Sequence, residues 1–298
     1  MPDTDPRKVL VTGATGNQGG AVVDALLQSD LAYEIYGLTR DRSGDFAQEL
    51  QLRGVEMVEG DMADKSSIKP HIEEVDTVFL VTNFWTAGYD GQVEQGTNVA
   101  EVAADVGIEH LVFSGVGSHD QETGIPHFDS AWEIDQKIQE LEVPNTVLKP
   151  VFFYQNFEGM RETIEGGRIA MPLKEGVRLQ MIDVADIGRV AATVIASPDE
   201  YVGERRELAG GSYTLINVAQ VFTRILDRYI NAVHVPISVA REQLGEEMAD
   251  MFEWFNEVGY NANVSALEDE FSIQFTDLES YAKREGWEPE LPEQVEEE

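Results

Sequence analysis

The stretch "VTGATGNQGG", residues 11–20, carries three glycines spaced three apart, at Gly13, Gly16 and Gly19. An apolar run, "KVLV", precedes it and a helical pattern follows it, which is the setting of a dinucleotide-binding loop. In such a loop Gly13 allows the tight turn, Gly16 lets a pyrophosphate approach the backbone, and Gly19 lets the helix lie close to the strand. Free N–H groups at the start of the helix then face the phosphates. The sequence therefore predicts a dinucleotide site here; the alternative is a structural glycine turn without a ligand.

Short apolar runs alternate with helical stretches along the first half of the chain. The predicted strands cover residues 8–14, 34–39, 55–60, 76–82, 110–115 and 145–150. Helical patterns at 17–30, 90–107 and 130–142 lie between several of them. Parallel strands need crossover connections, so six short strands with helices between them indicate an α/β fold with a doubly wound parallel sheet.

The second half of the chain is less regular, and it bears on the domain organisation. We expect a dinucleotide-binding domain over residues 1–150, to which residues 183–210 return through a helix at 183–197. A smaller domain for a substrate or a partner is expected over residues 151–182 and 211–290, with helices at 240–259 and 277–286. Residues 291–298 are expected to form a frayed acidic tail, because they are rich in glutamate and carry no apolar pattern.

The end of the second predicted strand indicates which dinucleotide is bound. An NAD site places an acidic residue about 20 positions after the last glycine, where it bonds the ribose 2′-hydroxyl. Here that position is Thr39, and Arg40 follows it. Arginine can form paired bonds with a 2′-phosphate and threonine adds a hydroxyl donor, so the sequence favours NADP, while NAD stays open. Arg42 is a second candidate; alternatively, Arg40 pairs with Asp41 or another surface acid.

The chain is strongly acidic. Its 298 residues contain 56 Asp and Glu against 21 Lys and Arg, which gives a net charge of −35. The acids are spread along the whole sequence, which favours adaptation to high salt, where electrolyte screens the self-repulsion. The alternative is a partner with a positively charged face.

Composition excludes several classes of function. The absence of cysteine rules out disulfides, thiolate nucleophiles and cysteine-ligated metals, and no His-Glu-x-x-His motif indicates a metal site. Adjacent basic residues occur only as Arg7-Lys8 and Arg205-Arg206, so no basic stripe indicates nucleic-acid binding. No apolar run reaches the roughly 20 residues of a membrane span, and the N-terminus has no apolar signal region. We expect a soluble cytoplasmic protein.

Several segments resemble one family, in order along nearly the whole chain. They are "VTGATGNQGGAVVDALL" (11–27), "LTRD" (38–41), "GDMAD" (60–64), "VTNFW" (81–85), "EQGTNVAEVAADVGIEHLVFSG" (94–115), "HFDSAWEID" (127–135), "KPVFFYQNF" (149–157) and "MIDVADIGRVAATVIASPDEYVGE" (181–204). Together they resemble the NmrA-like family, atypical members of the short-chain dehydrogenase/reductase superfamily. The resemblance implies a Rossmann domain, a smaller and mostly C-terminal α+β domain, and binding of NADP or NAD. Several members are thought to sense the cofactor redox state for a protein partner, whereas others nearby in the superfamily are reductases.

The resemblance also implies a set of cofactor contacts. The pyrophosphate would lie on the glycine loop, formed by Gly13, Thr15, Gly16, Asn17, Gln18 and Gly19. Thr39 and Arg40 would face the 2′-phosphate, Asp61 and Met62 the adenine, Thr82, Asn83 and Phe84 the ribose, and Phe152 and Asn156 the nicotinamide. Each group follows the carboxyl end of a strand, where open α/β sheets bind their ligands. For Phe84 and Phe152 the alternative is ordinary core packing.

The catalytic pair of the superfamily, Tyr-x-x-x-Lys on a helix, is absent. Its spacing places both side chains on one helix face, and the lysine lowers the pKa of the tyrosine so that it can donate a proton. None of the nine tyrosines is followed four positions on by lysine. Alignment with the family puts His127 in the tyrosine position and Ala131 in the lysine position. His127 is the remaining candidate acid, the alternative being a histidine that positions its loop; Lys149, at the end of a strand, has a different geometry.

These observations predict an NADP(H)-binding, redox-sensing regulator that lacks the catalytic pair and presents a surface to a protein partner. The rival interpretation is an NAD(P)H-dependent reductase of quinones or carbonyl compounds, in which the cleft alone positions the acceptor. Some hydride transfers need no protein acid if the anion formed as the product is stable.

Overall fold

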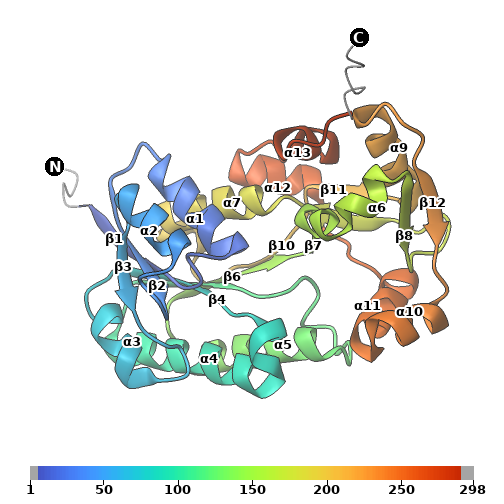
Figure 1. Ribbon diagram of the computed structural model, residues 1–298. Coiled ribbons are helices and arrows are strands. Elements are labelled where there is room, and N and C mark those ends of the chain that lie inside the picture. Colours follow the sequence, from blue (N-terminus) through green and yellow to red (C-terminus); the bar gives the residue numbers. More distant parts are fainter. Residues whose placement is uncertain (1–5, 290–298) are drawn as a thin grey trace, which may run out of the picture. The chain divides into compact units, whose positions relative to one another are not determined.

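A computed structural model describes residues 6–289, and the chain folds into two compact units (Figure 1). The first unit comprises residues 6–151, 184–208 and 262–273; the second comprises residues 152–183, 209–261 and 274–289. The segment 262–273 lies within the range that the sequence assigns to the smaller domain. It belongs to the first unit because Phe271 stacks on Tyr201, with ring centroids 5.5 Å apart, and Glu270 binds Arg206. The predicted acidic tail, residues 291–298, lies outside the described residues.

The first unit contains a seven-stranded sheet in which every strand pair is parallel. Its order is β10-β6-β5-β4-β1-β2-β3, and its strands are β1 (Arg7–Val11), β2 (Tyr33–Thr39), β3 (Glu56–Glu59), β4 (Thr77–Val81), β5 (His110–Ser114), β6 (Asn145–Pro150) and β10 (Arg205–Leu208). The order reverses between β1 and β4, as in a doubly wound sheet. The predicted α/β class is therefore confirmed. The first strand is shorter than expected, because the chain leaves the sheet at Thr12 to form the glycine turn.

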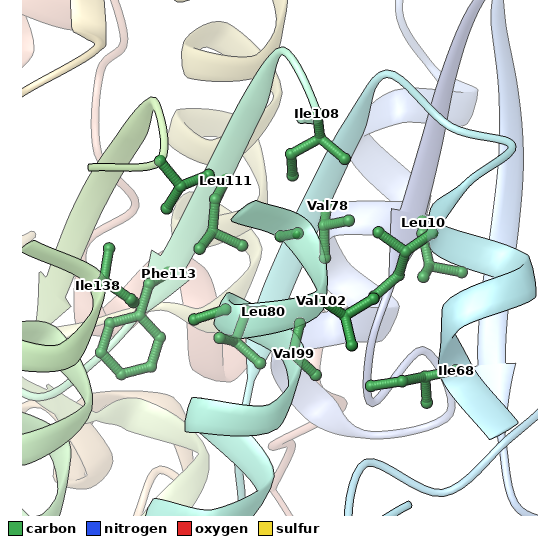
Figure 2. Close-up of a cluster of buried hydrophobic side chains, with 14 of the residues drawn as sticks. Leu10, Ile68, Val78, Leu80, Val99, Val102, Ile108, Leu111, Phe113 and Ile138 are labelled. Atoms are coloured by element: carbon green, nitrogen blue, oxygen red, sulfur yellow. The ribbon is translucent and has the colours of Figure 1, made fainter. Parts of the chain in front are cut away.

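Helices cover both faces of this sheet (Figure 1). They are α1 (Asn17–Leu27), α2 (Asp45–Leu52), α3 (Lys65–Ile72), α4 (Phe84–Val106), α5 (Pro126–Glu140), α7 (Val184–Ala196), α8 (Pro198–Tyr201) and α12 (Val264–Phe271). On one face, side chains of β1, β4 and β5 pack against α3, α4 and α5, and Figure 2 shows the cluster around Leu80, Val99 and Phe113. On the other face α1 packs closely on α7, where a Cβ on Gly188 would lie 2.2 Å from the carbonyl oxygen of Ala21.

Two predicted helices of the first unit begin earlier than expected. Helix α4 starts at Phe84 rather than at residue 90, and it is broken at Gly88, whose φ of 69° is not helical. Helix α5 starts at Pro126 rather than at residue 130, because proline is tolerated in the first turn, where its missing N–H is not needed. Both early turns carry side chains of the candidate site.

The second unit is an α+β assembly. A three-stranded sheet pairs β7 (Phe152–Phe153), β9 (Leu179–Ile182) and β11 (Gly211–Tyr213), and a two-stranded sheet pairs β8 (Arg168–Met171) with β12 (Asn231–His234). The remaining elements are η1 (Tyr154–Met160), α6 (Arg161–Glu165), α9 (Leu215–Ile225), α10 (Ile237–Leu244), α11 (Glu246–Glu257) and α13 (Leu278–Arg284). The single helix predicted at 240–259 is wrong. Gly245, at φ 90° and ψ 170°, ends α10 and starts α11 in a new direction.

The carboxylate of Glu158 in η1 forms several hydrogen bonds with the C-terminal part of the second unit. Glu158 Oε1 accepts hydrogen bonds from the Tyr281 hydroxyl (2.9 Å) and from Trp287 Nε1 (2.8 Å). Its Oε2 accepts from Arg161 Nε (3.0 Å) and Nη2 (2.8 Å). The Arg161 guanidinium also lies 4.2 Å from the ring centroid of Trp287 and donates to the carbonyl of Glu285 (2.9 Å). Tyr281 and Trp287 are buried, so this one side chain satisfies two buried donors.

Within residues 6–289, no helix is both long and apolar enough to cross a membrane. The same residues contain no cluster of three or more His, Asp or Glu side chains suited to a metal ion.

A buried histidine makes the stability of the first unit dependent on pH. His110, at the start of β5, has its Nε2 atom 2.8 Å from Thr146 Oγ1, which itself donates to the carbonyl oxygen of Tyr201 (2.6 Å). The hydroxyl therefore accepts from a neutral imidazole. Burial, with the charge of Arg7, lowers the pKa of His110 to about 4 from 6.5.

We expect the free energy of unfolding to fall as the pH drops from 6.5 towards 4. Above pH 6.5 His110 is neutral in both the folded and the unfolded state. Between pH 6.5 and 4 only the unfolded chain takes up the proton, which lowers the free energy of unfolding, and below pH 4 that decrease is complete. The contribution at pH 5 is about 2 kcal/mol. In His110→Gln, the difference in unfolding free energy between pH 7 and pH 5 should shrink by this amount, measured by urea denaturation. The control His234→Gln, at an exposed position at the end of β12, should keep the wild-type pH dependence, and an unchanged dependence in His110→Gln would contradict the assignment.

Candidate dinucleotide site

The glycine turn between β1 and α1 is built from backbone contacts. Gly13 has a φ of +58°, a conformation that side chains disfavour, and its carbonyl oxygen accepts from the Gly16 N–H at 2.8 Å. A Cβ on Gly19 would lie 2.2 Å from that same oxygen and 2.8 Å from the carbonyl oxygen of Thr12. The glycine at position 19 is therefore required for the helix to start against the strand, as its spacing predicts.

The N-terminus of α1 is open to an anion. Its first residues, Asn17 and Gln18, follow Gly16, and no side chain caps the helix by a hydrogen bond. No acidic residue stands in the first turn, although the chain is rich in acids. Thr15, Gly16 and Asn17 are exposed. The dipole and free N–H groups of such a helix end favour a phosphate, so this cradle fits the pyrophosphate of a dinucleotide.

Two further side chains, Thr12 and Ser114, shape this crevice at the point where the strand order reverses. The Thr12 hydroxyl donates to the carbonyl oxygen of Val81 (3.0 Å) and accepts from the Val81 N–H (2.8 Å), which joins the ends of β1 and β4. Ser114, at the end of β5, donates to Gln18 Oε1 at 2.7 Å and so orients that amide. Sequence reasoning missed both residues; the only signal was a hydroxyl at the end of an apolar strand.

Arg40 stands exposed after β2, as predicted, and it forms no ion pair with any residue between 6 and 289. The carboxylate of Asp41 accepts instead from the N–H (2.8 Å) and hydroxyl (2.6 Å) of Ser43, and these bonds lower the pKa of Asp41. The Thr39 hydroxyl bonds the backbone of Asp41. Arg42 also has no ionic partner in the described part of the chain. The alternative in which Asp41 neutralises Arg40 therefore does not occur, and the guanidinium can bind a 2′-phosphate.

The residues predicted beside the adenine lie in the turn after β3. The Asp61 carboxylate accepts from the N–H of Ala63 (3.0 Å), and the backbone N–H of Asp61 donates to the Ser67 hydroxyl (2.9 Å). The carbonyl oxygen of Met62 accepts from the Asn98 amide (2.9 Å), and the Met62 side chain packs on the hydrophobic cluster. This turn is therefore ordered by contacts of its own, and its role beside the adenine stays a prediction.

The residues predicted along the ribose lie at the carboxyl end of β4. The side-chain amide of Gln92 connects two hydroxyls. Its Nε2 donates to the hydroxyl of Thr82 (2.8 Å), and its Oε1 accepts from the buried hydroxyl of Ser130 (2.6 Å). Asn83 caps α4 by accepting from the N–H of Trp85 (3.0 Å). Gln92 and Ser130 were not predicted, because they lie on two different helices and Ser130 acts on Thr82 only through Gln92.

The helix aligned with the catalytic pair carries no such pair in the structure. Ala131 is buried in the packing of α5, and His127 is 9% exposed. The His127 ring lies among aromatic rings, with centroids 4.8 Å from Phe128, 5.3 Å from Trp85 and 5.8 Å from Phe84. Phe84 is therefore part of a cluster of rings beyond the carboxyl end of β4. Lys149 does not replace the missing lysine, because both carboxylate oxygens of Asp120 hold its Nζ at 3.1 Å.

The loop between β5 and α5 is fixed by side chains that sequence reasoning missed. His119 Nδ1 accepts from the Val116 N–H (3.3 Å), so its Nε2 donates to Asp135 on α5 (3.1 Å). Arg205 on β10 donates to the same carboxylate (2.7 Å). Burial acts to raise the pKa of Asp135, but the bonds from His119 and Arg205 outweigh it and lower that pKa. The loop therefore holds the start of α5, and with it His127, in a fixed place.

Phe152 and Asn156, the residues predicted beside the nicotinamide, belong to the second unit. The Phe152 ring lies 6.2 Å from that of Phe157 and 6.3 Å from that of Phe255, between centroids, and Asn156 is exposed. Their part in the site stays a prediction. The structure brings together, within the first unit, the ends of β1, β4 and β5 with the start of α1.

Comparison with known proteins places this geometry in one family. A profile of the NmrA-like family matches residues 5–287. An NmrA-like family domain-containing protein from Dictyostelium discoideum is 28% identical over 274 residues, which cover 85% of this chain and 88% of the relative. An NAD(P)H azoreductase from Xenophilus azovorans is 32% identical over 64% of each chain.

Solved structures share the fold. The triphenylmethane reductase of Citrobacter sp., complexed with NADP(H), superposes with a TM-score of 0.82 at 21% identity, over 93% of this chain and 99% of the other. NmrA, a negative transcriptional regulator, in complex with NADP, superposes with a TM-score of 0.74 at 18% identity, over 93% and 94%. The dinucleotide predicted from the end of β2, NADP, is the one that both of these proteins hold.

Proposed function

The chain belongs to the NmrA-like family, and from this premise we propose that it binds NADP(H) on its first unit and acts as a reductase. The residues fit the dinucleotide. The glycine turn leaves no room for a Cβ at position 19, the N-terminus of α1 is uncapped, and Arg40 has no ionic partner among residues 6–289. The relatives include a named azoreductase, and the structural neighbours include a reductase that holds NADP(H).

The ring cluster at the carboxyl end of β4 is the observation that carries the reductase role. Reduced dinucleotide supplies a hydride when it is bound. A sensor needs only the dinucleotide site, whereas Trp85, packed on Phe84 and His127, presents an exposed ring after β4, which fits a flat acceptor. Because the Tyr/Lys pair is absent, we expect acceptors whose reduced form is stable without a proton from the protein, such as quinones, rather than simple ketones.

The test is NADPH oxidation in molar KCl with a quinone, an azo compound and a simple ketone. Turnover of the quinone or the azo compound at about 1–10³ s⁻¹ would support the reductase. The ketone should be slower by about 10²–10⁴, the usual contribution of a positioned acid. Equal rates with ketone and quinone would contradict the role assigned to the missing pair, and no oxidation with any acceptor would overturn the reductase.

A redox-sensing regulator is the second candidate, and the lack of a Tyr/Lys pair on α5 favours it. The neighbour NmrA, a transcriptional regulator, holds NADP on the same fold. A sensor should bind NADP and NADPH with clearly different affinities and turn over neither. Calorimetric titration with both forms, beside the oxidation assay, separates the two roles.

The specificity for NADP depends on Arg40. We expect Arg40→Ala to weaken NADP binding by about 1.5–3 kcal/mol, or about 10- to 150-fold, because a charge-assisted pair of bonds is lost. NAD lacks the 2′-phosphate, so its affinity should hardly change. Isothermal titration of both nucleotides measures the difference. Equal losses for the two nucleotides would contradict the assignment, and a loss that appears only in Arg42→Ala would move the contact to Arg42.

The charge of −35 is the basis for a proposal of adaptation to high salt. At low ionic strength the Debye length is long and the carboxylates repel one another. We expect the melting temperature to rise markedly from 50 mM to 2 M KCl, measured by circular dichroism. A melting temperature independent of salt would instead favour a positively charged partner.

A further inference from the structure

A chain of two hydrogen bonds fixes the direction of the Thr82 hydroxyl at the carboxyl end of β4. The buried Ser130 hydroxyl on α5 donates to Gln92 Oε1 at 2.6 Å, and Gln92 Nε2 donates to Thr82 Oγ1 at 2.8 Å. These lengths fit this orientation of the amide, because O–H···O bonds are normally shorter than N–H···O bonds. Thr82 is partly exposed, and within residues 6–289 no other residue bonds its hydroxyl. Its oxygen therefore accepts from Gln92, and its proton is left to donate outward.

Close packing of α4 on α5 holds this chain of bonds in place. A Cβ on Gly96 would lie 2.6 Å from the side chain of Ile134, so the glycine lets the two helices approach closely. Gln92 precedes Gly96 by four positions and Ser130 precedes Ile134 by four, so the two contacts lie one turn apart on both helices. Gln92 is 5% exposed and Ser130 is fully buried. The orientation of the amide is therefore set by the fold rather than by a ligand.

The strand order indicates which half of a dinucleotide lies near Thr82. Arg40 follows β2, the glycine turn follows β1 and Thr82 follows β4, and these strands are neighbours in the order β4-β1-β2. A dinucleotide with its 2′-phosphate at Arg40 and its pyrophosphate at the glycine turn extends its nicotinamide half toward β4. The ribose of that half carries hydroxyl oxygens that accept hydrogen bonds.

We propose that Gln92 and Ser130 are positioning residues, which make Thr82 a hydrogen-bond donor to the nicotinamide ribose of NADP(H). This role rests on the dinucleotide site proposed above and names the part of the ligand that this edge of the sheet recognises. A hydroxyl that rotates freely must first be ordered, and that ordering reduces the affinity gained from the bond. Because Gln92 orders the Thr82 hydroxyl in advance, the ribose oxygen meets a donor that is already aligned.

The first test compares NADP⁺ with adenosine 2′,5′-bisphosphate, which keeps the 2′-phosphate but lacks the nicotinamide half, by calorimetric titration in 2 M KCl. Thr82→Val should raise the dissociation constant for NADP⁺ about 2- to 12-fold, because one hydrogen bond is lost, and should leave that for the bisphosphate unchanged. Thr82→Ser keeps the hydroxyl and should bind NADP⁺ like the wild type. The control Thr193→Val removes a hydroxyl bonded within α7, to the carbonyl oxygen of Arg189, and should change neither constant.

The second test reverses the direction of the hydroxyl with Gln92→Glu at pH 8. A carboxylate accepts from both Ser130 and Thr82, which turns the Thr82 proton inward and removes the donor from the ligand. The same substitution in the Thr82→Val background measures the effect of the added charge alone. We expect Gln92→Glu to weaken NADP⁺ about 2- to 12-fold more when the Thr82 hydroxyl is present. Ser130→Ala should weaken NADP⁺ in the wild type and cause no further loss in Gln92→Met.

Two results would overturn the positioning role. One is an equal effect of Gln92→Glu with and without the Thr82 hydroxyl, and the other is an equal loss of NADP⁺ and the bisphosphate in Thr82→Val. A wild-type protein that binds neither ligand would instead contradict the dinucleotide site itself, so the two failures are distinguishable.

Discussion

Replacing Gly19 with alanine should abolish NADP binding and lower the free energy of unfolding by about 3 kcal/mol or more. The new Cβ would lie 2.2 Å from the carbonyl oxygen of Gly13, 2.5 Å from its carbonyl carbon and 2.8 Å from the carbonyl oxygen of Thr12. All three are backbone atoms, so no side chain can rotate away. Overpacking at sites with more freedom already costs 1–3 kcal/mol. Here the helix must also move away from β1, which removes the phosphate cradle.

The neighbouring residue provides a matched control. A Cβ on Gly20 would lie 3.5 Å from the carbonyl oxygen of Ala14, an ordinary contact. Gly20→Ala should therefore stabilise α1 slightly, since alanine is favoured over glycine in a helix by about 1 kcal/mol, and should retain NADP binding. Urea denaturation and isothermal titration of the two variants measure both effects. A Gly19→Ala protein that binds NADP like the wild type would show that the turn can open without loss of the site.

Much of the first unit follows from local patterns. Buried parallel strands read as continuous apolar runs, which is why "KVLV" and "TVFLV" were assigned correctly. The strand β10 was missed because Arg205, Arg206 and Glu207 give it no apolar run. It is an edge strand, and its charges are satisfied by side chains such as Asp135 and Glu270 that lie far away in the sequence. Charged edges of this kind discourage pairing with another chain.

The site was predictable where one residue type is required by backbone geometry. Gly13 and Gly19 of the turn are such cases, whereas Arg40 is predicted from the charge of a 2′-phosphate and its role stays a prediction. Thr12, Gln92 and Ser114 were not, because their roles come from partners that are 69, 10 and 96 positions away. Trp85 appears in the sequence only as the last residue of the segment "VTNFW", and nothing in that segment predicts that its ring is exposed.

Removal of the Glu158 carboxylate is expected to have the largest effect on the second unit. Glu158→Ala would leave the Tyr281 hydroxyl and the Trp287 N–H buried without their acceptor and would remove one of the two carboxylates that pair with Arg161. An unsatisfied buried donor costs about 1–3 kcal/mol, so the two together should lower the free energy of unfolding by about 2–6 kcal/mol. Glu158→Gln keeps one carbonyl oxygen for these donors and should lose less.

The effect should be local before it is global, because Trp287 and Tyr281 both donate their hydrogen bonds to this one carboxylate of η1. Amide hydrogen exchange over residues 278–287 should accelerate in Glu158→Ala, and the near-ultraviolet signal of the buried Trp287 should weaken. Glu162→Ala removes the same charge from an exposed position four residues further on and should leave both signals unchanged. If the two variants unfold alike, the stabilisation comes from net charge in a strongly acidic chain, and the hydrogen bonds to Glu158 contribute little.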